Sequence, residues 1–170
     1  THNIALDGYG IRYKYGLFKQ DIQDGFQVEY ADDWTRWGDP WSIRNENDSV
    51  EVQFKDMTVK AVPYDMPVIG YGTDNVGTLR LWQAESLVPF DFDLFNQQKY
   101  DKSVNLKNRA EDISRVLYPN DDTFEGKKLR LKQQYFFSSA SLQDIIRKYK
   151  SIHGADFREF SDYITIQLND

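Results

Sequence analysis

Apolar side chains occupy every second position in several stretches of the first half of the chain. Tyr, Ile, Tyr, Tyr and Leu fill the odd positions of residues 9–17, and a shorter alternation follows over residues 26–30. Residues 21–25 between them favour a turn, so we expect an antiparallel hairpin. Gly8 and Gly10 interrupt the first strand, and we interpret them as a β-bulge in preference to the close approach of another backbone or a ligand.

The same alternation continues over residues 50–54, 57–64 and 76–84, which are separated by short segments rich in Asn, Asp, Pro and Gly. A period of two residues is typical of strands that are buried on one face. The glycines of residues 70–75 are too loosely spaced for a phosphate-binding loop, so we expect a simple connection there. The first half of the chain is therefore predicted to be β-rich, with partly antiparallel pairing.

Helical spacing replaces the alternation near residue 100. Residues 104–117 predict an amphipathic helix, and residues 127–151 predict a longer one that is apolar on two sides. Pro, Asn, Asp and Gly in residues 118–126 end the first helix before the second begins. Residues 163–169 alternate again and predict a final strand. The result is a mixed α/β fold with a β-rich first half, two long helices and a last strand, and no domain boundary within residues 1–170.

Charge and composition disfavour several classes of partner. The net charge is −6, with acidic and basic residues interspersed, so we expect no binding to nucleic acid. The chain has no cysteine and no apolar run long enough to span a membrane. We therefore expect no disulfide framework, no membrane partner and a cytoplasmic location. Thr1 in place of an initiator Met indicates that the sequence begins inside a longer protein.

Carboxylates are the first candidates for chemistry, because hydrolysis of a glycosidic bond uses two of them about 5 to 9 Å apart. The candidates are Asp121, Asp122, Glu125 and Asp170. The residue pattern alone favours an alternative, in which the first three cap the following helix and interact with its dipole. His2 and His153 are too isolated for a metal site or a catalytic triad, so we expect them on the surface.

Two further features allow either a binding or a structural interpretation. Trp34, Trp37 and Trp41 could form a platform for stacking sugars or an aromatic corner of the core, and we favour the core. Arg80 could bind an anion or pair with a neighbouring carboxylate, and we favour the ion pair.

Several longer motifs resemble, in order, the glycogen (α-glucan) phosphorylase family. They are GYGIRY at residues 8–13, ADDW at 31–34, GDPW at 38–41, VPYD at 62–65, LRLW at 79–82, RVLYPND at 115–121, FEG at 124–126, LRLKQ at 129–133, LQDIIR at 142–147 and IQLND at 166–170. The resemblance extends over nearly the whole chain, although members of this family are several times longer. It implies an internal fragment of the N-terminal, Rossmann-like domain of a two-domain (GT-B type) glycosyltransferase.

The activity implied by this resemblance belongs to the parent enzyme. It is the cleavage of terminal α-1,4-linked glucose from glycogen, starch or maltodextrin by inorganic phosphate, which gives glucose 1-phosphate. The partners would be α-1,4-glucan, phosphate and a second subunit, because the matching helix, residues 104–117, packs against its mate in phosphorylase dimers. The cofactor of the family, pyridoxal phosphate, is held by a downstream domain. We therefore expect no catalytic, cofactor-binding or metal-binding residue in this chain, and no activity from it alone.

The resemblance also implies residues at the edge of the substrate site. Asn120, Asp121 and Asp122 match a loop that borders the catalytic cleft and contacts bound sugar. Arg130 matches an arginine associated with the position of that loop, and Asp170 matches an acid at the glucan-acceptor subsites. This chain has Asp122 followed by Thr where many members have Asn followed by an aromatic residue, so the loop is a divergent version.

An alternative from a different class remains open. Since 15% of the residues are Phe, Trp or Tyr, the chain could be a non-catalytic glucan-binding or protein-interaction module. Such a module should bind maltoheptaose without help, whereas part of a cleft should bind it weakly or not at all.

Overall fold

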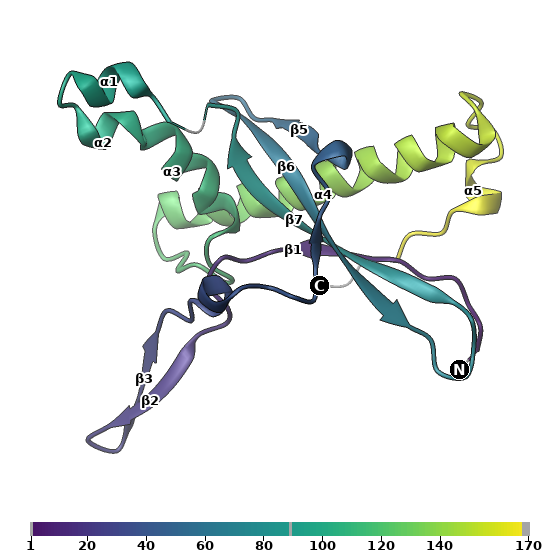
Figure 1. Cartoon of the computed structure of the whole chain (residues 1–170), viewed down its shortest axis with the longest axis horizontal. Coiled ribbons are helices and arrows are strands. Elements are labelled where there is room, and N and C mark those ends of the chain that lie inside the picture. Colours follow the sequence, from purple (N-terminus) through teal and green to yellow (C-terminus); the bar gives the residue numbers. More distant parts are fainter. Residues whose placement is uncertain (1, 89, 168–170) are drawn as a thin grey trace.

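A computed structural model describes residues 2–88 and 90–167, and its central feature is a twisted sheet (Figure 1). The strands are β1 (Gly8–Ile11), β4 (Ile43–Arg44), β5 (Val50–Gln53), β6 (Thr58–Ile69) and β7 (Val76–Ser86). Their order is β1-β7-β6-β4, and β5 also pairs with β6. Only β1 and β7 run parallel among these pairs. The predicted strands at residues 50–54, 57–64 and 76–84 are thus confirmed, together with the partly antiparallel pairing.

Strand β1 is shorter and more regular than expected. The alternation at residues 9–17 forms a strand only over Gly8–Ile11, in unbroken register with residues 79–82 of β7. The predicted β-bulge is therefore wrong. A Cβ atom at Gly10 would lie 2.9 Å from Cδ2 of Leu81, and one at Gly8 would lie 3.1 Å from Cδ1 of Leu79. The two glycines leave room for the leucine side chains of the neighbouring strand.

A hairpin is present, but its first strand is not the predicted one, because residues 8–11 of that strand pair with β7 instead. The hairpin projects from the rest of the molecule (Figure 1). It consists of β2 (Lys19–Gln23) and β3 (Phe26–Tyr30), which pair only with each other. Asp24 and Gly25 form the turn, and both have positive φ angles, 51° and 84°. Two such residues are what a tight two-residue hairpin turn requires. The first hairpin strand lies at residues 19–23, in part where we expected the turn.

The helices lie mainly in the second half of the described residues. They are α1 (Phe92–Asn96), α2 (Tyr100–Ser103), α3 (Asn105–Glu111), α4 (Phe124–His153) and α5 (Phe160–Tyr163), with 3-10 turns η1 (Trp34–Trp37), η2 (Glu46–Asp48) and η3 (Asp112–Ser114). The mixed α/β class is confirmed. The long second helix is also confirmed, and α4 extends the predicted range at both ends.

The first predicted helix, residues 104–117, is much shorter in the structure. Its α-helical part is α3, and it tightens into η3 before it ends. The cause is a competing set of hydrogen bonds to the sheet side of the molecule. Ser114 accepts from the backbone N–H of Ala84 through Oγ and from Lys14 through its carbonyl oxygen, over 3.0 and 2.9 Å. Periodicity predicts an apolar face, but it carries no information about these bonds.

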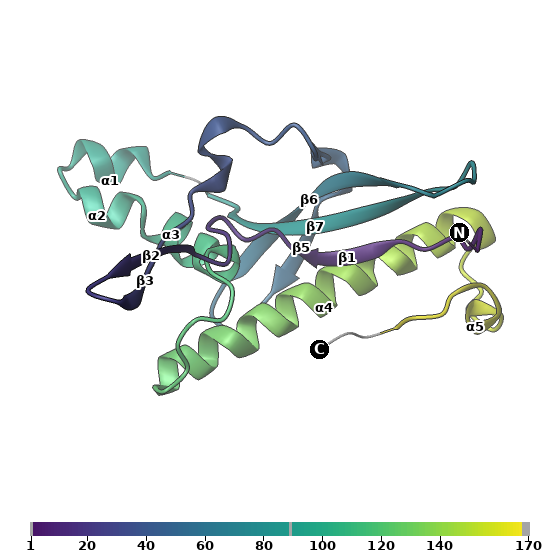
Figure 2. The ribbon, with the colours of Figure 1, turned by 90° about the horizontal axis from the view of Figure 1, so that it is seen from below.

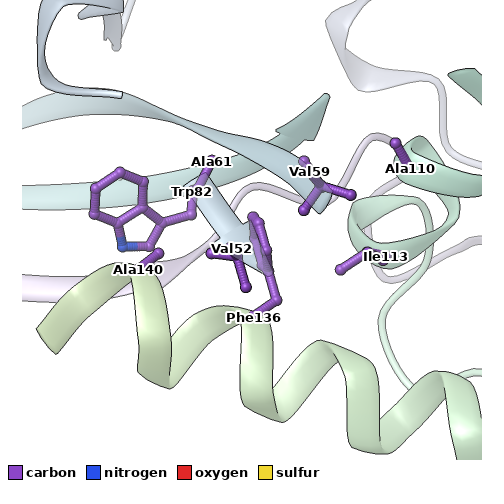
Figure 3. Close-up of a cluster of buried hydrophobic side chains, with 9 residues drawn as sticks. Val52, Val59, Ala61, Trp82, Ala110, Ile113, Phe136 and Ala140 are labelled. Carbon is purple, nitrogen blue, oxygen red and sulfur yellow. The ribbon is translucent and has the colours of Figure 1, made fainter. Parts of the chain in front are cut away.

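Helix α4 lies across one face of the sheet (Figure 2). The core between them is formed by Val52, Val59, Ala61, Trp82, Ala84, Ala110, Ile113, Phe136 and Ala140. Figure 3 shows Trp82 above Ala140, and Phe136 beside Val52. The opposite side of α4 is also apolar, as predicted, but it is only partly covered here. Leu131 is 66% exposed, and Tyr135 is 50% exposed although its ring packs against that of Phe54.

The final predicted strand is wrong over the described residues. Tyr163 ends α5, and residues 164–167 form no strand. Residues 168 and 169 of the predicted range lie outside the described part of the chain. Alternation shows which side chains share a face, but a strand also needs a neighbour to pair with. Within the described residues no strand lies beside residues 164–167.

Candidate functional site

The loop at residues 118–123 joins η3 to α4 and carries three of the expected site residues. Its backbone is bent by Tyr118, whose φ angle is positive at 53°. Asn120 and Asp122 then bond to each other twice. The side-chain amide of Asn120 donates to Asp122 Oδ2, and the backbone N–H of Asp122 donates to Asn120 Oδ1, both over 2.9 Å. These bonds give the loop a defined local shape.

A salt bridge ties the loop to the helix that follows. Arg130 Nη1 lies 2.6 Å from Asp121 Oδ2, and the two side chains are 43% and 44% exposed. A partly exposed ion pair of this kind contributes at most about 1 kcal/mol. Arg130 thus neutralises one carboxylate of the loop, and it does so through a contact that can open easily.

The capping interpretation of the loop acids is correct only in part. Thr123 is the N-cap residue of α4, and its side chain accepts from the backbone N–H of Gly126 over 3.2 Å. Glu125 is the acid of the first turn. Asp121 and Asp122 instead bond to Arg130 and Asn120. Thr is among the preferred N-cap residues, so the sequence contained a signal for Thr123 that the acids beside it obscured.

Gln133 is a further contributor that sequence reasoning missed. It is buried, and its side-chain amide donates to the backbone carbonyl of Val116 over 2.9 Å. The chain segment that leads into the loop is therefore fixed to α4 as well. A buried glutamine in a helix signals a specific partner, but the sequence does not identify that partner.

The structure brings Asn120, Asp121, Asp122 and Arg130 together at the start of α4. Asp170, the fifth expected site residue, lies outside the described residues. The four described residues form an exposed polar surface, which can offer an amide and a carboxylate to a hydroxyl-rich ligand.

A second cluster of charges surrounds Arg80 in the core. Its guanidinium group donates to Asp65, Asp144 and Asp48, each over 2.7 Å. Arg147 and Lys148 also reach Asp144, over 2.6 and 3.2 Å. The three cations and three carboxylates balance each other. The ion-pair interpretation of Arg80 is confirmed, because its donors are directed to protein carboxylates.

The protonation states of this cluster follow from its geometry. Burial acts to raise the pKa of Asp144, but hydrogen bonds from Arg147 and Tyr9, together with the charge of Arg80, outweigh it and lower the pKa. Asp65 behaves in the same way, because the bonds from Arg80 outweigh the effect of burial on its pKa. Burial and the bond to Asp144 raise the pKa of Tyr9. Asp144 and Asp65 are therefore ionised and the phenol of Tyr9 is neutral around neutral pH.

The comparison with known proteins decides the family. A family model described as carbohydrate phosphorylase matches residues 1–170. The chain belongs to the carbohydrate phosphorylase family. It is 48% identical over 193 residues to the liver form of glycogen phosphorylase from Homo sapiens and to the brain form from Bos taurus, and 47% identical to the liver form from Ovis aries.

This phosphorylase-family chain is matched along its whole length, but it spans only 22–23% of the length of those relatives. The matched region of 193 residues is longer than the chain of 170 residues, so the relatives carry additional residues within it. The resemblance inferred from the motifs is confirmed.

The tryptophans divide into two groups in this phosphorylase-family chain. Trp34 donates to the backbone carbonyl of Tyr13 over 3.0 Å, and the guanidinium group of Arg12 lies 4.9 Å from its ring centre. Trp37 and Trp41 are 86% and 74% exposed. The expected core position is therefore wrong for these two. A spacing of three to four residues places side chains on a common face only if the backbone is helical throughout, and η1 ends at Trp37.

The described residues include no group of side chains that is arranged to bind a metal ion or pyridoxal phosphate. They contain no group of three or more His, Cys, Asp or Glu side chains arranged for a metal ion. All lysines of the chain are described and none is buried, and the half-buried ones, Lys60, Lys132 and Lys148, pair with carboxylates. The residues present therefore do not fit pyridoxal phosphate, which needs an enclosed lysine for covalent attachment. His2 and His153 are exposed, as expected. No described helix is both long and apolar enough to cross a membrane.

Proposed function

We propose that the chain is part of the N-terminal, Rossmann-like half of a GT-B type α-glucan phosphorylase that depends on pyridoxal phosphate. The parent would cleave terminal α-1,4-linked glucose from a glucan with inorganic phosphate and release glucose 1-phosphate. The observation that carries this proposal is the match of the family model to all 170 residues, with 48% identity to glycogen phosphorylases.

This chain would contribute one edge of the substrate cleft of the parent enzyme. Asn120 and Asp122 are exposed, and their amide and carboxylate can bond to sugar hydroxyls. Asp121 is neutralised by Arg130, so Asp122 keeps the free charge of the loop. A free carboxylate repels phosphate. This loop would therefore contact the sugar, and cations elsewhere in the parent would hold the phosphate.

Two features support a larger parent. The outer apolar side of α4 is partly exposed in this chain, at Leu131 and Leu142. Contiguous exposed apolar surface of this kind commonly belongs to an interface. The lysines are exposed or already paired, so the cofactor would be held by residues outside this chain. A cytoplasmic location is part of the same proposal.

Only part of residues 104–117 is available for the proposed homodimer contact. The apolar positions that predict this helix are Leu106, Ala110, Ile113 and Leu117. Ala110 and Ile113 are each 1% exposed and belong to the core, so two of these four serve internal packing. Leu106 is 53% exposed and remains available to a second subunit. A contact there would use the outward side of α3.

The test is an assay of the full-length parent protein with maltodextrin and phosphate. We expect release of glucose 1-phosphate. Asp122→Ala should raise the KM for maltodextrin about tenfold or more, because a hydrogen bond to a charged group contributes about 1.5–3 kcal/mol. Asp74→Ala, at an exposed position in the turn between β6 and β7, is the matched control. Absence of product from the wild-type protein would refute the proposed activity, and an unchanged KM in Asp122→Ala would remove the loop from the cleft.

A further inference from the structure

Gly126 occupies a position where a helix would ordinarily prefer another residue. It lies in the first turn of α4, and its φ angle is not positive, so its backbone conformation does not require glycine. Glycine within a helix costs about 1 kcal/mol relative to alanine. The structure must therefore gain something from the absence of a side chain here.

The gain is space for the loop. A Cβ atom at Gly126 would lie 2.9 Å from Cα of Asp121 and 3.0 Å from the carbonyl carbon of Asn120, and it would come closer still to the Asn120 carbonyl oxygen. All three are backbone atoms, which cannot rotate away as a side chain can. A methyl group at this position would therefore displace the loop itself.

Gly126 is also part of a continuous strip on α4. Arg130 and Gln133 follow it at spacings of four and three residues, which places all three on one side of the helix. Each contacts a different part of the same segment. The side chain of Gln133 bonds to Val116, and that of Arg130 bonds to Asp121. The backbone of Asn120 lies directly against Gly126. The segment is thus held against the helix at Val116, Asn120 and Asp121.

We propose that Gly126 is a positioning residue, which sets the place of Asn120 and Asp122 at the cleft by letting the loop backbone rest directly on α4. Its effect on substrate binding rests on the proposed function of the loop. The ion pair of Arg130 and the cap of Thr123 cannot take over this role, because both are polar contacts that can form again after the loop has moved slightly. The close contact between Gly126 and the loop backbone, in contrast, is lost when any side chain is added at residue 126.

The substitution that tests this role is Gly126→Ala in the full-length parent protein. Lys127→Ala is the matched control, since Lys127 is exposed and lies next to Gly126 in the same turn. The first readout is hydrogen exchange of peptides covering residues 116–126. We expect the backbone N–H of Asp122 to exchange at least tenfold faster in Gly126→Ala, because the loop loses its support, while the later turns of α4 keep their protection.

The second readout is steady-state phosphorolysis. A displacement of the loop by about 1 Å should raise the KM for maltodextrin about tenfold and leave kcat within about twofold, since the loop acts in binding. General destabilisation would instead lower kcat through loss of folded enzyme and leave KM unchanged. If Gly126→Ala does not fold, Gln133→Met releases Val116 from the same strip and should give the same faster exchange.

The two proposals can fail separately. An active wild-type enzyme with unchanged exchange and unchanged KM in Gly126→Ala would overturn the positioning role and leave the proposed function intact. An inactive wild-type enzyme in which Gly126→Ala still accelerates exchange in the loop would support the steric role and refute the proposed activity.

Discussion

Arg80 Nη1 donates to Asp144 Oδ1 over 2.7 Å and joins the interior strand β7 to α4. The side chain of Asp144 is fully buried, and that of Arg80 is only 6% exposed. The same guanidinium group reaches Asp65 on β6 and Asp48 in η2. A single cation thus connects the helix layer, two strands and a 3-10 turn beside the apolar core.

The first prediction is that Arg80→Met destabilises the chain by about 3–5 kcal/mol, because it removes the central cation from one buried and two half-buried carboxylates, Asp144, Asp65 and Asp48. The double variant Arg80→Met with Asp144→Leu should lose less than the sum of the two single changes, since it removes both sides of the pair. Urea unfolding followed by tryptophan fluorescence measures both effects.

A matched control is available at the surface. Arg158 pairs with Asp156, and these side chains are 88% and 53% exposed. Arg158→Ala should leave the urea midpoint unchanged within error, because exposed ion pairs contribute little. Equal losses in Arg80→Met and Arg158→Ala would show that the buried cluster is no more important than a surface pair.

The second prediction concerns acid. The pKa of Asp144 and that of Asp65 are lower in the folded chain than in the unfolded chain, so the folded state binds fewer protons. Their contribution to stability is complete above the unfolded pKa of about 3.9 and is lost as the pH falls through that value toward the folded pKa. When the urea midpoint is measured from pH 7 to pH 3, it should begin to decrease once the pH is below about 5. The slope should be smaller in Asp144→Asn, and an identical slope would contradict this assignment.

The third prediction concerns the contact between β1 and β7. Gly10→Ala would place a methyl group 2.9 Å from Cδ2 of Leu81 and should cost about 1–3 kcal/mol through overpacking. Leu81→Val in the same chain shortens the side chain and should restore part of the loss. A double-mutant cycle by thermal unfolding measures the coupling. Strictly additive effects would indicate that Gly10 is needed for another reason.

The sequence predicts this fold best where a local pattern of side chains is enough to identify a helix or strand. The period of two at residues 57–64 and 76–84 identifies β6 and β7, and the breakers before Gly126 locate the start of α4. The prediction fails where a residue distant in the sequence determines whether an element forms or where it ends. Ser114 ends the first helix by bonding to Ala84, and residues 164–167 have no strand beside them among the described residues.

The candidate site shows the same division. The motifs of residues 115–133 identify the loop and the family, and both the ion-pair role of Arg80 and the grouping of Asn120 with Arg130 agree with the structure. The sequence does not show that Gly126 is needed for space, because glycine in a turn-rich segment reads as a turn residue. The distance to the backbone of Asn120 and Asp121 becomes visible only in three dimensions.

The last prediction is that the 170-residue chain alone releases no glucose 1-phosphate and attaches no pyridoxal phosphate at a specific lysine. Orientation of phosphate toward the anomeric carbon can supply about 7–11 kcal/mol of barrier lowering, and it requires cations around the phosphate. Among the described residues the loop offers Asp122 as a free acid, while Arg130 is paired with Asp121. The loop residues 118–123 therefore supply no cation that could hold the phosphate.

The experiment combines the purified chain with pyridoxal phosphate, maltodextrin and phosphate. Product is measured against a buffer control, and borohydride reduction followed by peptide mass spectrometry locates any attached cofactor. Exposed lysines such as Lys127 and Lys150 should be labelled sparsely and without preference, because no described lysine is buried, and burial is what shifts the pKa of a lysine and raises its reactivity. Stoichiometric labelling of a single lysine together with release of glucose 1-phosphate would mean that these residues contain a complete site, and the assignment of the chemistry to other parts of the parent would then be wrong.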